Sequence, residues 1–401
     1  MKSARSKVLH ELFGKPMIEY CLETVSEIGI DKSIVVAGRN RGELESLLGK
    51  RAEIVFQKER LGTGHALMSA RPKLRGFDGE LLVLAADAPL IRPETLRDFA
   101  KSHREHEADA SILAAELENP EGYGRILRDE SGNVVGIRED LEATRAEKEI
   151  REVNSSIYLF DSKKVFGALE NIKPSRLKKE YYLTDAVEFL VKNGSRVKAY
   201  PLAEGEELLG INTRKDLALA AREIWKRNID FYLERGVTIV SPENTYIESG
   251  AAIGTDTVIF PFTYIEKNVK IGKNCRVGPF CKIRSGSTVK DRAVVGSFVE
   301  IVRSSIGKNT LVKHLAYLGD ALVGNNVNIG AGTITANFDG KKKNKTRIGD
   351  KAFIGCDTIA IAPVSIGRGA KTGAGTVIPQ GKNVPANSTV VGIPARILRK
   401  K

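Results

Sequence analysis

The stretch IESGAAIGTDTVIFPFTYIEKNVKIGKNCRVGPFCKIRSGSTVKDRAVVGSFVEI, residues 247–301, carries an aliphatic residue at every sixth position. Because six is an even number, residues six apart on an extended chain point to the same side. A repeat of this length is typical of a parallel β-helix, in which short strands stack their aliphatic side chains from coil to coil. We expect an interior lined by Ile247, Ile253, Ile259, Ile265, Ile271, Val277, Ile283, Val289, Val295 and Ile301.

The repeat changes phase near a histidine. It slips to Ile306 and again to Val323, on either side of Lys313-His314, and it breaks over residues 335–347 before it resumes at Ile348. The break predicts an external loop. Glycines that follow repeated positions predict tight corners, because glycine adopts backbone dihedrals that β-branched residues resist. These glycines are Gly254, Gly272, Gly278 and Gly296.

Length and composition predict two domains. The chain has 401 residues, which is long for one core, and only its C-terminal part carries the repeat. The four cysteines form no C-x-x-C pair and the five histidines are scattered, so neither a disulfide framework nor a zinc site is indicated. No segment resembles a signal peptide or reaches the length of a membrane span. We therefore expect a cytoplasmic protein without a membrane span.

The net charge of +13 favours anionic ligands such as nucleotides, sugar phosphates and coenzyme A. Nucleic acid is the alternative ligand, but no aromatic-rich RNA-binding pattern accompanies the basic residues, which are spread along the chain. We therefore expect no nucleic-acid partner. The basic clusters that do occur are Lys341-Lys342-Lys343 and Arg399-Lys400-Lys401.

The N-terminal half alternates predicted strands and helices, as in a doubly wound α/β sheet. Strands are expected at 33–37, 53–56, 81–84 and 110–117, and helices at 16–28, 43–48, 63–70 and 93–106. A longer helix, 213–235, is the natural connector. The expected domains are therefore 1–212 and 237–401, joined by a helical linker at 213–236.

Two features stand where ligands bind in such sheets, at the carboxyl ends of strands. Gly62-Thr63-Gly64 lies between a strand and a helix, where backbone N–H groups can receive a phosphate or a base edge, although a plain turn has the same signature. Asp87 follows the strand 81–84 and places a carboxylate where a nucleotide-bound Mg²⁺ would lie. A turn-capping aspartate is the alternative for Asp87.

Dense motifs connect both halves with a known family. The N-terminal motifs are Lys7-Val8-Leu9-His10, Gln57, Leu61-Gly62-Thr63-Gly64-His65-Ala66, Asp87-Ala88-Pro89-Leu90, Gly122-Tyr123-Gly124-Arg125-Ile126, Glu139, Asn154, Tyr182-Leu183-Thr184-Asp185 and Gly210-Ile211-Asn212. The C-terminal motifs are Gly278-Pro279-Phe280, His314-Leu315-Ala316-Tyr317-Leu318-Gly319-Asp320 and Asn326-Val327-Asn328-Ile329-Gly330-Ala331-Gly332-Thr333. Over nearly its whole length the chain resembles the GlmU family of bifunctional enzymes that make UDP-N-acetylglucosamine.

The resemblance implies an α/β nucleotidyltransferase (Rossmann-like) domain followed by a left-handed parallel β-helix. It implies acetyl transfer from acetyl-CoA to glucosamine-1-phosphate, and then uridylyl transfer from UTP to N-acetylglucosamine-1-phosphate, with Mg²⁺. The product is a precursor of peptidoglycan and lipopolysaccharide. The family is homotrimeric and builds its acetyl-transfer site from neighbouring subunits.

The resemblance also assigns residues. It implies UTP and sugar binding by Lys7, Gln57, Gly62, Thr63, Gly124, Glu139, Asn154 and Asn212, and Mg²⁺ binding by Asp87 and Asn212. It implies binding of the acceptor sugar phosphate by Arg284, Tyr317 and Asn328, and of acetyl-CoA by Ala331, Asn337, Phe338, Cys356 and Ala374. His314 would be the catalytic base. A lone histidine is usually structural, but this one lies at the phase slip and is the only histidine after His106.

The chain departs from the family pattern in several places. Val302, followed by Arg303, stands where the family has a phosphate-binding lysine, and Phe338 replaces a tyrosine. The tail from Gly392 to Arg396 looks more like other hexapeptide acyltransferases. The family begins with a strand and a Gly-rich L-A-A-G-x-G-T-R-M loop, whose last residue resembles Met1. We expect an in-frame upstream extension, neighbouring strands that lack a partner, and little uridylyl transfer from residues 1–401 alone.

Two other functions stay open at this point. One is a sugar-1-phosphate nucleotidylyltransferase whose β-helix serves only oligomerisation, and His314 together with Tyr317 and Asn328 counts against it. The other is a non-catalytic scaffold, and the presence of Asp87 and Asn212 counts against that.

Overall fold

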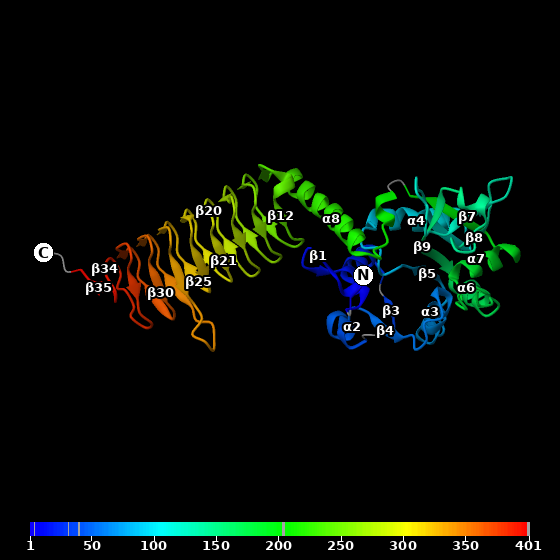
Figure 1. The fold of residues 1–401 in the computed structure, drawn as a ribbon, viewed down its shortest axis with the longest axis horizontal. Coiled ribbons are helices and arrows are strands. Elements are labelled where there is room, and N and C mark those ends of the chain that lie inside the picture. The colour runs from blue at the N-terminus through cyan, green and yellow to red at the C-terminus, as the bar shows by residue number, and fades with distance from the viewer. Residues whose placement is uncertain (4, 31, 39–40, 203–204, 399–401) are drawn as a thin grey trace. The chain divides into compact units, whose positions relative to one another are not determined.

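The computed structural model describes residues 1–3, 5–30, 32–38, 41–202 and 205–398. It divides the chain into two compact units, Met1–Ala221 and Arg222–Lys401. The division falls within helix α8 (Arg214–Glu234), the segment that the sequence predicts as the connector. The two units are described separately below (Figure 1). None of the helices in the described ranges is long and apolar enough to cross a membrane.

A six-stranded mixed sheet forms the centre of the first unit. Its strands run in the order β10 (Val197–Pro201), β6 (Ala110–Glu116), β9 (Glu152–Asp161), β7 (Arg125–Arg128) and β8 (Val134–Arg138), with β5 (Glu80–Val83) also paired to β9. β10 and β6 are parallel, whereas β9 runs antiparallel to β5, β6 and β7. The sheet is therefore mixed, and not the purely parallel sheet of a doubly wound fold.

Both faces of this sheet are covered, because successive residues of β6 enter different clusters of buried side chains. Ile112 packs with α6 (Ser162–Leu169) and α7 (Leu183–Lys192) on one face. Leu113 packs with α4 (Pro93–Glu105) on the other. The remaining α-helices are α1 (Met17–Glu27), α2 (Arg41–Leu48), α3 (Thr63–Ala70) and the short α5 (Arg145–Lys148). The predicted helices and strands agree with the observed ones within two residues at each end.

The first unit also contains strands outside the six-stranded sheet. β3 (Ile34–Ala37) and β4 (Glu53–Phe56) form a separate parallel pair. Within the described ranges, β3 pairs only with β4, and β5 pairs only with β9.

The second unit is a left-handed parallel β-helix of three stacked sheets (Figure 1). Its first sheet contains β11 (Thr238–Ile239), β14 (Val258–Ile259), β17 (Arg276–Val277), β20 (Val294–Ser297), β23 (Leu311–His314), β26 (Asn328–Ile329), β29 (Phe353–Ile354), β32 (Lys371–Thr372), β34 (Thr389–Val391) and β35 (Arg396–Ile397). The second contains β12 (Tyr246–Ile247), β15 (Tyr264–Ile265), β18 (Lys282–Ile283), β21 (Glu300–Val302), β24 (Tyr317–Gly319), β27 (Ile334–Ala336), β30 (Ile359–Ile361) and β33 (Val377–Ile378). The third contains β13 (Ala252–Ile253), β16 (Lys270–Ile271), β19 (Thr288–Val289), β22 (Ser305–Ile306), β25 (Ala321–Val323), β28 (Thr346–Ile348) and β31 (Val364–Ile366).

The predicted interior of the β-helix is confirmed. All ten marked residues from Ile247 to Ile301 are buried except Ile253, which is partly buried against the same cluster. The end of α8 closes the first coil, where Trp225 Nε1 donates to Thr245 O at 2.7 Å and the Tyr232 hydroxyl donates to Ala251 O at 2.8 Å. The apolar ladder and its helical cap together form one core.

The predicted reason for the corner glycines is wrong at three of the four positions. Only Gly278 has a positive φ, of 98°. The other three lie where adjacent coils approach closely: a Cβ on Gly296 would lie 2.0 Å from Lys313 O, and one on Gly254 would lie 2.7 Å from the carbonyl carbon of Gly272. Left-handed corners are formed instead by residues such as Asp256, Asn268, Asn274, Asn309 and Asn326.

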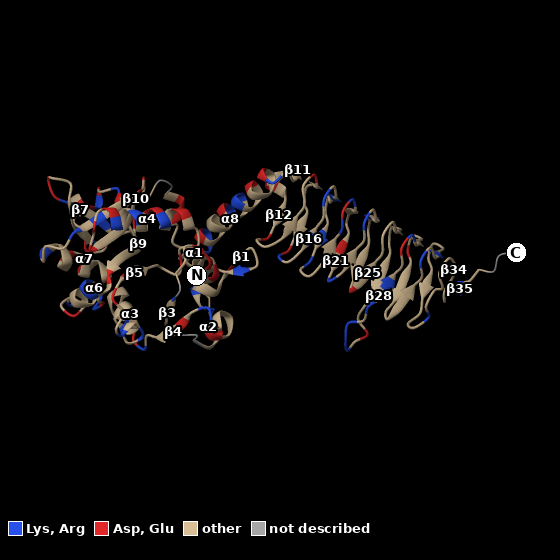
Figure 2. Cartoon of the chain, turned by 180° about the vertical axis from the view of Figure 1, so that it is seen from behind, with Lys and Arg blue, Asp and Glu red and all other residues tan. Residues whose placement is uncertain are grey.

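The external loop is shorter than predicted. Thr335 lies in β27 and is fully buried, and its hydroxyl accepts a hydrogen bond from Gly319 N at 2.8 Å and donates one to Gly319 O at 3.0 Å. Thr346 in β28 is also fully buried. A threonine with a satisfied hydroxyl can occupy a core position, so the repeat continues through Thr335. The loop comprises residues 337–345, projects from the coils, and carries basic residues (Figure 2).

Candidate active sites

Three of the predicted nucleotide-site residues meet at one point in the first unit. The Lys7 ammonium contacts Asp87 Oδ2 and donates to Asn212 Oδ1 at 2.7 Å. Asp87 follows β5, Asn212 precedes α8, and Ile211 N donates to Asp87 O at 3.1 Å, which holds the two segments together. A carboxylate oxygen and an amide oxygen therefore converge on a single cation.

This pair of oxygen donors fits a hard divalent cation. Mg²⁺ is usually bound by one or two protein oxygens, with phosphates and water completing its coordination. Within the described ranges there is no group of three or more His, Cys, Asp or Glu side chains that could hold a metal by itself. Asp87 and Asn212 thus suit a metal that arrives with a nucleotide.

The loop before α3 requires glycine at Gly62. Its φ is 98°, and a Cβ there would lie 2.6 Å from Tyr181 O. The loop is attached to the segment before α7 by two hydrogen bonds, from Tyr181 N to Leu61 O at 2.7 Å and from Gly64 N to Tyr181 O at 2.8 Å. The motif is therefore more than a plain turn, because it depends on a segment distant in sequence.

Polar side chains of the same region are held in place by α7 and by the loop. Thr63 Oγ1 accepts from Leu183 N at 3.0 Å, and Gln57 Nε2 donates to Gly62 O at 3.2 Å. Thr184 Oγ1 donates to Glu139 Oε1 at 2.8 Å. Burial raises the pKa of Glu139 above its usual value, and neighbouring carboxylates add to this.

Gly124 and Asn154 lie together at the end of the β7–β9 pair. Asn154 N donates to Gly124 O at 2.9 Å, and a Cβ on Gly124 would lie 3.1 Å from Ile137 Cγ2 and 3.7 Å from Asn154 Cβ. Asn154 Nδ2 donates to the Tyr158 hydroxyl at 2.7 Å. The predicted nucleotide and sugar residues thus fall into small groups, each fixed by its own hydrogen bonds.

In the second unit, the predicted base and three predicted acetyl-CoA residues occupy one corner of successive coils. The strand registers place Val312 beside Ile329, Ile329 beside Ile354, and Phe353 beside Lys371. Corner hydrogen bonds join the same coils, from Gly332 N to Leu315 O, from Asp357 N to Ala331 O and from Gly375 N to Cys356 O, at 2.7 to 2.9 Å. We call this column the His314 edge; it consists of His314, Ala331, Cys356 and Ala374.

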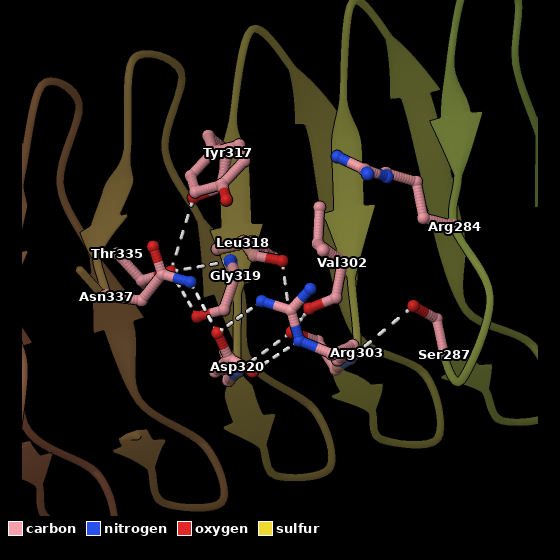
Figure 3. A network of polar contacts seen from close by, with 12 residues as sticks. Arg284, Ser287, Val302, Arg303, Tyr317, Leu318, Gly319, Asp320, Thr335 and Asn337 are labelled. Atoms are coloured by element: carbon pink, nitrogen blue, oxygen red, sulfur yellow. Dashed lines mark hydrogen bonds and ion pairs between the residues drawn. The ribbon is translucent and has the colours of Figure 1, made fainter. Parts of the chain in front are cut away.

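The second sheet carries other predicted residues on its outer face. Arg284, Val302 and Gly319 form one row across neighbouring coils, and the Tyr317 side chain lies over Gly319 (Figure 3). A Cβ on Gly319 would lie 2.8 Å from the Tyr317 hydroxyl and 2.7 Å from Asn337 Nδ2. A predicted sugar-phosphate residue and a predicted acetyl-CoA residue therefore meet above this glycine.

Asn328 is not on that face. It lies in β26 of the first sheet, beside Leu311 of the strand that ends in His314. The structure therefore places Asn328 and Tyr317 on two faces that flank the His314 edge. His314 is exposed at the end of β23.

The departures from the family pattern have structural consequences. Val302 is buried, and Arg303 points toward Asp320, to which it donates two hydrogen bonds of 2.8 and 2.7 Å (Figure 3). Arg284 itself pairs with Glu300 at 3.4 Å and Glu266 at 3.8 Å.

Phe338, a predicted acetyl-CoA residue, is exposed, and the Lys343 ammonium lies 5.3 Å from its ring centre. The residue of this region that was missed as a candidate is Asp320. Asp320 is the last residue of the motif that begins at His314, but the resemblance assigns it no role. The signal that pointed to it was the phase slip after Leu318, because the shortened corner contains Asp320.

Family models match both units of this architecture. The Nucleotidyl transferase family model matches residues 2–207. Bacterial transferase hexapeptide (six repeats) matches residues 250–285 and 268–303, and the hexapeptide repeat of succinyl-transferase matches residues 345–380. A solved UDP-glucose pyrophosphorylase complexed with UDP-glucose superposes with a TM-score of 0.45 at 20% identity, over 55% of this chain and 90% of that one.

Two relatives match almost end to end. The bifunctional protein GlmU of Desulfitobacterium hafniense (strain DSM 10664 / DCB-2) is 41% identical over 424 aligned positions, which cover 98% of this chain and 93% of that protein. The bifunctional protein GlmU of Acetivibrio thermocellus is 40% identical, with 98% and 92% covered. With a nucleotidyltransferase unit joined to a hexapeptide-repeat unit and identity of this extent, the chain belongs to the GlmU family of bifunctional enzymes.

Proposed function

We propose which residues carry the two reactions of this GlmU-family chain. The enzyme transfers acetyl from acetyl-CoA to glucosamine-1-phosphate, and then transfers uridylyl from UTP to N-acetylglucosamine-1-phosphate, releasing pyrophosphate. The observation that carries the assignment is the His314 edge, because it places the only histidine of the β-helix in line with Ala331, Cys356 and Ala374. An oligomerisation module or a scaffold has no need of such an alignment.

The acetyl transfer needs a base. The acceptor amine is protonated near neutral pH, so it must lose one proton before its nitrogen can attack the thioester carbonyl. A second proton leaves the nitrogen as the amide forms and the C–S bond breaks, and the departing CoA thiolate takes up a proton. An imidazole nitrogen can accept a proton in this step, and His314 is exposed beside the face that carries Tyr317. Arg284 would bind the sugar phosphate in exchange for its present contacts with Glu266 and Glu300.

The uridylyl transfer would use the first unit. Asp87 and Asn212 would hold Mg²⁺, which neutralises phosphate charge when it is bound. Lys7 now occupies the position between these two oxygens, so metal binding would free its ammonium to contact the nucleotide phosphates. Gln57, Gly62 and Thr63 would bind the base side of UTP. Gly124, Glu139 and Asn154 would bind the sugar.

We further propose that the protein is a homotrimer. Three aromatic rings stack along one corner of the β-helix, with ring centres 4.8 Å apart for Phe262 and Phe280 and 5.4 Å for Phe280 and Phe298. They are 51%, 47% and 61% exposed, and Leu315, next to His314, continues the row at 60%. An exposed apolar row of this length is typical of an interface between copies, and a closed ring avoids open assembly.

The cytoplasm is the proposed location, because UTP and acetyl-CoA are cytoplasmic metabolites. The four cysteines are free thiols in this structure, which fits a reducing compartment.

A product assay tests the function directly. The purified chain is incubated with glucosamine-1-phosphate, acetyl-CoA, UTP and Mg²⁺, and the products are identified by mass spectrometry. Formation of N-acetylglucosamine-1-phosphate and free CoA supports the acetyltransferase assignment. Uridylyl transfer without CoA release would favour the nucleotidylyltransferase alternative, and neither product would favour the scaffold. Starting from N-acetylglucosamine-1-phosphate and UTP measures the second step alone.

A further inference from the structure

Three polar residues occupy a second corner column of the β-helix, at the opposite end of β21 and β24 from the His314 edge. Val302 pairs with Gly319, and Tyr317 pairs with Ile334, so the residues Arg303, Asp320 and Asn337 follow one another in successive coils. Arg303 and Asp320 have positive φ values of 47° and 49°. These are the two corners at which the hexad phase slips, so the slips create the column.

Asp320 is the centre of the column (Figure 3). It accepts from Arg303 Nε through Oδ1 at 2.8 Å and from Arg303 Nη2 through Oδ2 at 2.7 Å. Its Oδ2 also accepts from Asn337 Nδ2. The hydrogen bonds from Arg303 lower the pKa of Asp320, and those from Asn337 and the nearby Lys343 charge act in the same direction. Asp320 is therefore a carboxylate at neutral pH, and a carboxylate can only accept hydrogen bonds.

This chemistry determines which way the Asn337 amide faces. An amide group beside an acceptor-only partner must turn its NH₂ toward that partner and its oxygen away. Asn337 is buried, and its Oδ1 has no hydrogen-bond partner among the residues of the described ranges. The amide lies beside the Tyr317 hydroxyl, because both groups are within 2.8 Å of the position of a Cβ on Gly319. An amide with a free acceptor oxygen is thus held beside Tyr317, a predicted sugar-phosphate residue.

We propose that Asp320 is a positioning residue for acetyl transfer, which orients Asn337 so that its Oδ1 accepts a hydrogen bond from a substrate N–H group. The N–H belongs either to an amide of the pantetheine arm of acetyl-CoA or to the amine of the acceptor sugar. The role of Arg303 is to fix the Asp320 carboxylate by two hydrogen bonds, and not to bind phosphate in place of the family's lysine. The inference rests on the acetyl transfer proposed above.

The first test is Asp320→Asn. The NH₂ group of the new side chain at position 320 can donate to Asn337 Oδ1. The Asn337 amide would then be turned around, so that its NH₂ group, and not its oxygen, faces the substrate N–H. Because a mismatched buried hydrogen bond is expensive, we expect kcat/KM for acetyl transfer to fall about 10- to 100-fold. Uridylyl transfer, trimer mass and melting temperature should stay near wild type. A rise in KM for acetyl-CoA alone identifies the pantetheine amide, and a rise for glucosamine-1-phosphate alone identifies the amine.

The exchange variant Asp320→Asn with Asn337→Asp separates positioning from simple structural support. Asn at 320 can donate to the carboxylate at 337, whose second oxygen again faces the substrate as an acceptor. We expect most of the lost kcat/KM to return. The matched control is Asp291→Asn, which removes a carboxylate that accepts from Lys273 N and pairs with Lys308 at a different corner of the β-helix. It should leave acetyl transfer unchanged.

Several outcomes would overturn the proposal. One is Asp320→Asn with a rate within threefold of wild type; another is a folded exchange variant that recovers nothing. If Asp320→Asn does not fold, Asn337→Ala decides, since it removes the acceptor and leaves the Arg303–Asp320 pair intact: a wild-type rate would contradict the proposal. The wild-type reaction is measured in parallel. Its absence would refute the proposed function, and the acetyl-CoA affinity of each variant by calorimetry would then test Asp320 independently of turnover.

Discussion

Lys7 and Asp87 form an ion pair at the point where Asn212 also presents its amide oxygen, so a side-chain ammonium occupies the place between two oxygens that suit a divalent cation. The pair therefore links the position of Lys7 to the two oxygens that are proposed to hold Mg²⁺.

Asp87→Asn is expected to lower kcat for uridylyl transfer by at least about 100-fold, because a metal held by an amide in place of a carboxylate loses charge stabilisation. Acetyl transfer should be unchanged, since Asp87 lies in the other unit. The check is an assay of both reactions at increasing Mg²⁺. Asp78→Asn, which breaks the exposed pair with Lys163, is the matched control. Equal rates in wild type and Asp87→Asn would contradict the metal assignment.

Gly319→Ala should reduce acetyl transfer by about 100-fold. The added Cβ would lie 2.7 Å from Asn337 Nδ2 and 2.8 Å from the Tyr317 hydroxyl, so one of these side chains must move. A misplacement of about 1 Å can cost this much in rate. Steady-state kinetics for both substrates give the effect, with uridylyl transfer as the internal control. Gly167→Ala, where a Cβ meets no atom within 4 Å, should alter neither rate; an unaffected Gly319→Ala would show that the Tyr317 and Asn337 positions are unimportant.

Phe280→Ser should weaken the trimer. The substitution removes the middle ring of the exposed stack and with it apolar area that an interface would bury. Light scattering at micromolar concentration is expected to give a trimer for wild type and smaller species for the variant. Phe77→Ser changes a ring of similar exposure, 44% against 47%, and should leave the mass unchanged. A stable wild-type monomer would contradict the trimer and any site shared between subunits.

Asp185→Asn should stabilise the first unit at high pH only. Burial, followed by the charges of Glu142, Glu188 and Glu139, raises the pKa of Asp185 to about 6. Its usual value of about 3.9 applies in the unfolded chain. Because the folded pKa is the higher one, ionisation above pH 6 opposes folding, and this penalty disappears below about pH 4.

The gain for Asp185→Asn at pH 8 should be on the order of 1 kcal/mol after allowance for solvent screening, a few degrees in melting temperature. Scanning calorimetry at pH 8 and pH 4 gives the comparison. Asp129→Asn is the control, because hydrogen bonds from the Asn133 backbone and side chain lower the pKa of Asp129, and its loss should give no gain at pH 8. Stabilisation of Asp185→Asn that is equal at both pH values would exclude a charge effect.

The β-helix was the most predictable part of the chain, because a repeat of six residues makes the repeated side chains point into the interior in every coil. Thr335 escaped the pattern because its place in the core depends on hydrogen bonds to Gly319, which periodicity does not show. Gly296 was predicted from the backbone dihedrals of a tight corner, but glycine is required there because the next coil approaches closely at Lys313. This approach depends on how the coils stack and is not visible in the repeat.

The sites were harder to predict. The hexad phase alone places His314 and Ala331 on one edge. The hydrogen bond between Asn337 and Asp320 could not be predicted in this way, because it depends on the lengths of two corners and on the orientation of the Asn337 amide. In the first unit, Lys7 contacts Asn212 although the two residues are 205 positions apart in the sequence. Nothing in the residues around either one indicates that contact.

The most direct test of the account is His314→Ala, measured as kcat for CoA release with glucosamine-1-phosphate, together with melting temperature and trimer mass. His106→Ala, at an exposed histidine of the first unit, serves as the control. The account predicts a loss of about 10²- to 10⁴-fold for His314→Ala with assembly and uridylyl transfer intact, because a positioned base is removed and the aliphatic ladder is untouched. A folded trimeric variant that releases CoA within a few fold of wild type would contradict the assignment of the His314 edge as the acetyl-transfer site.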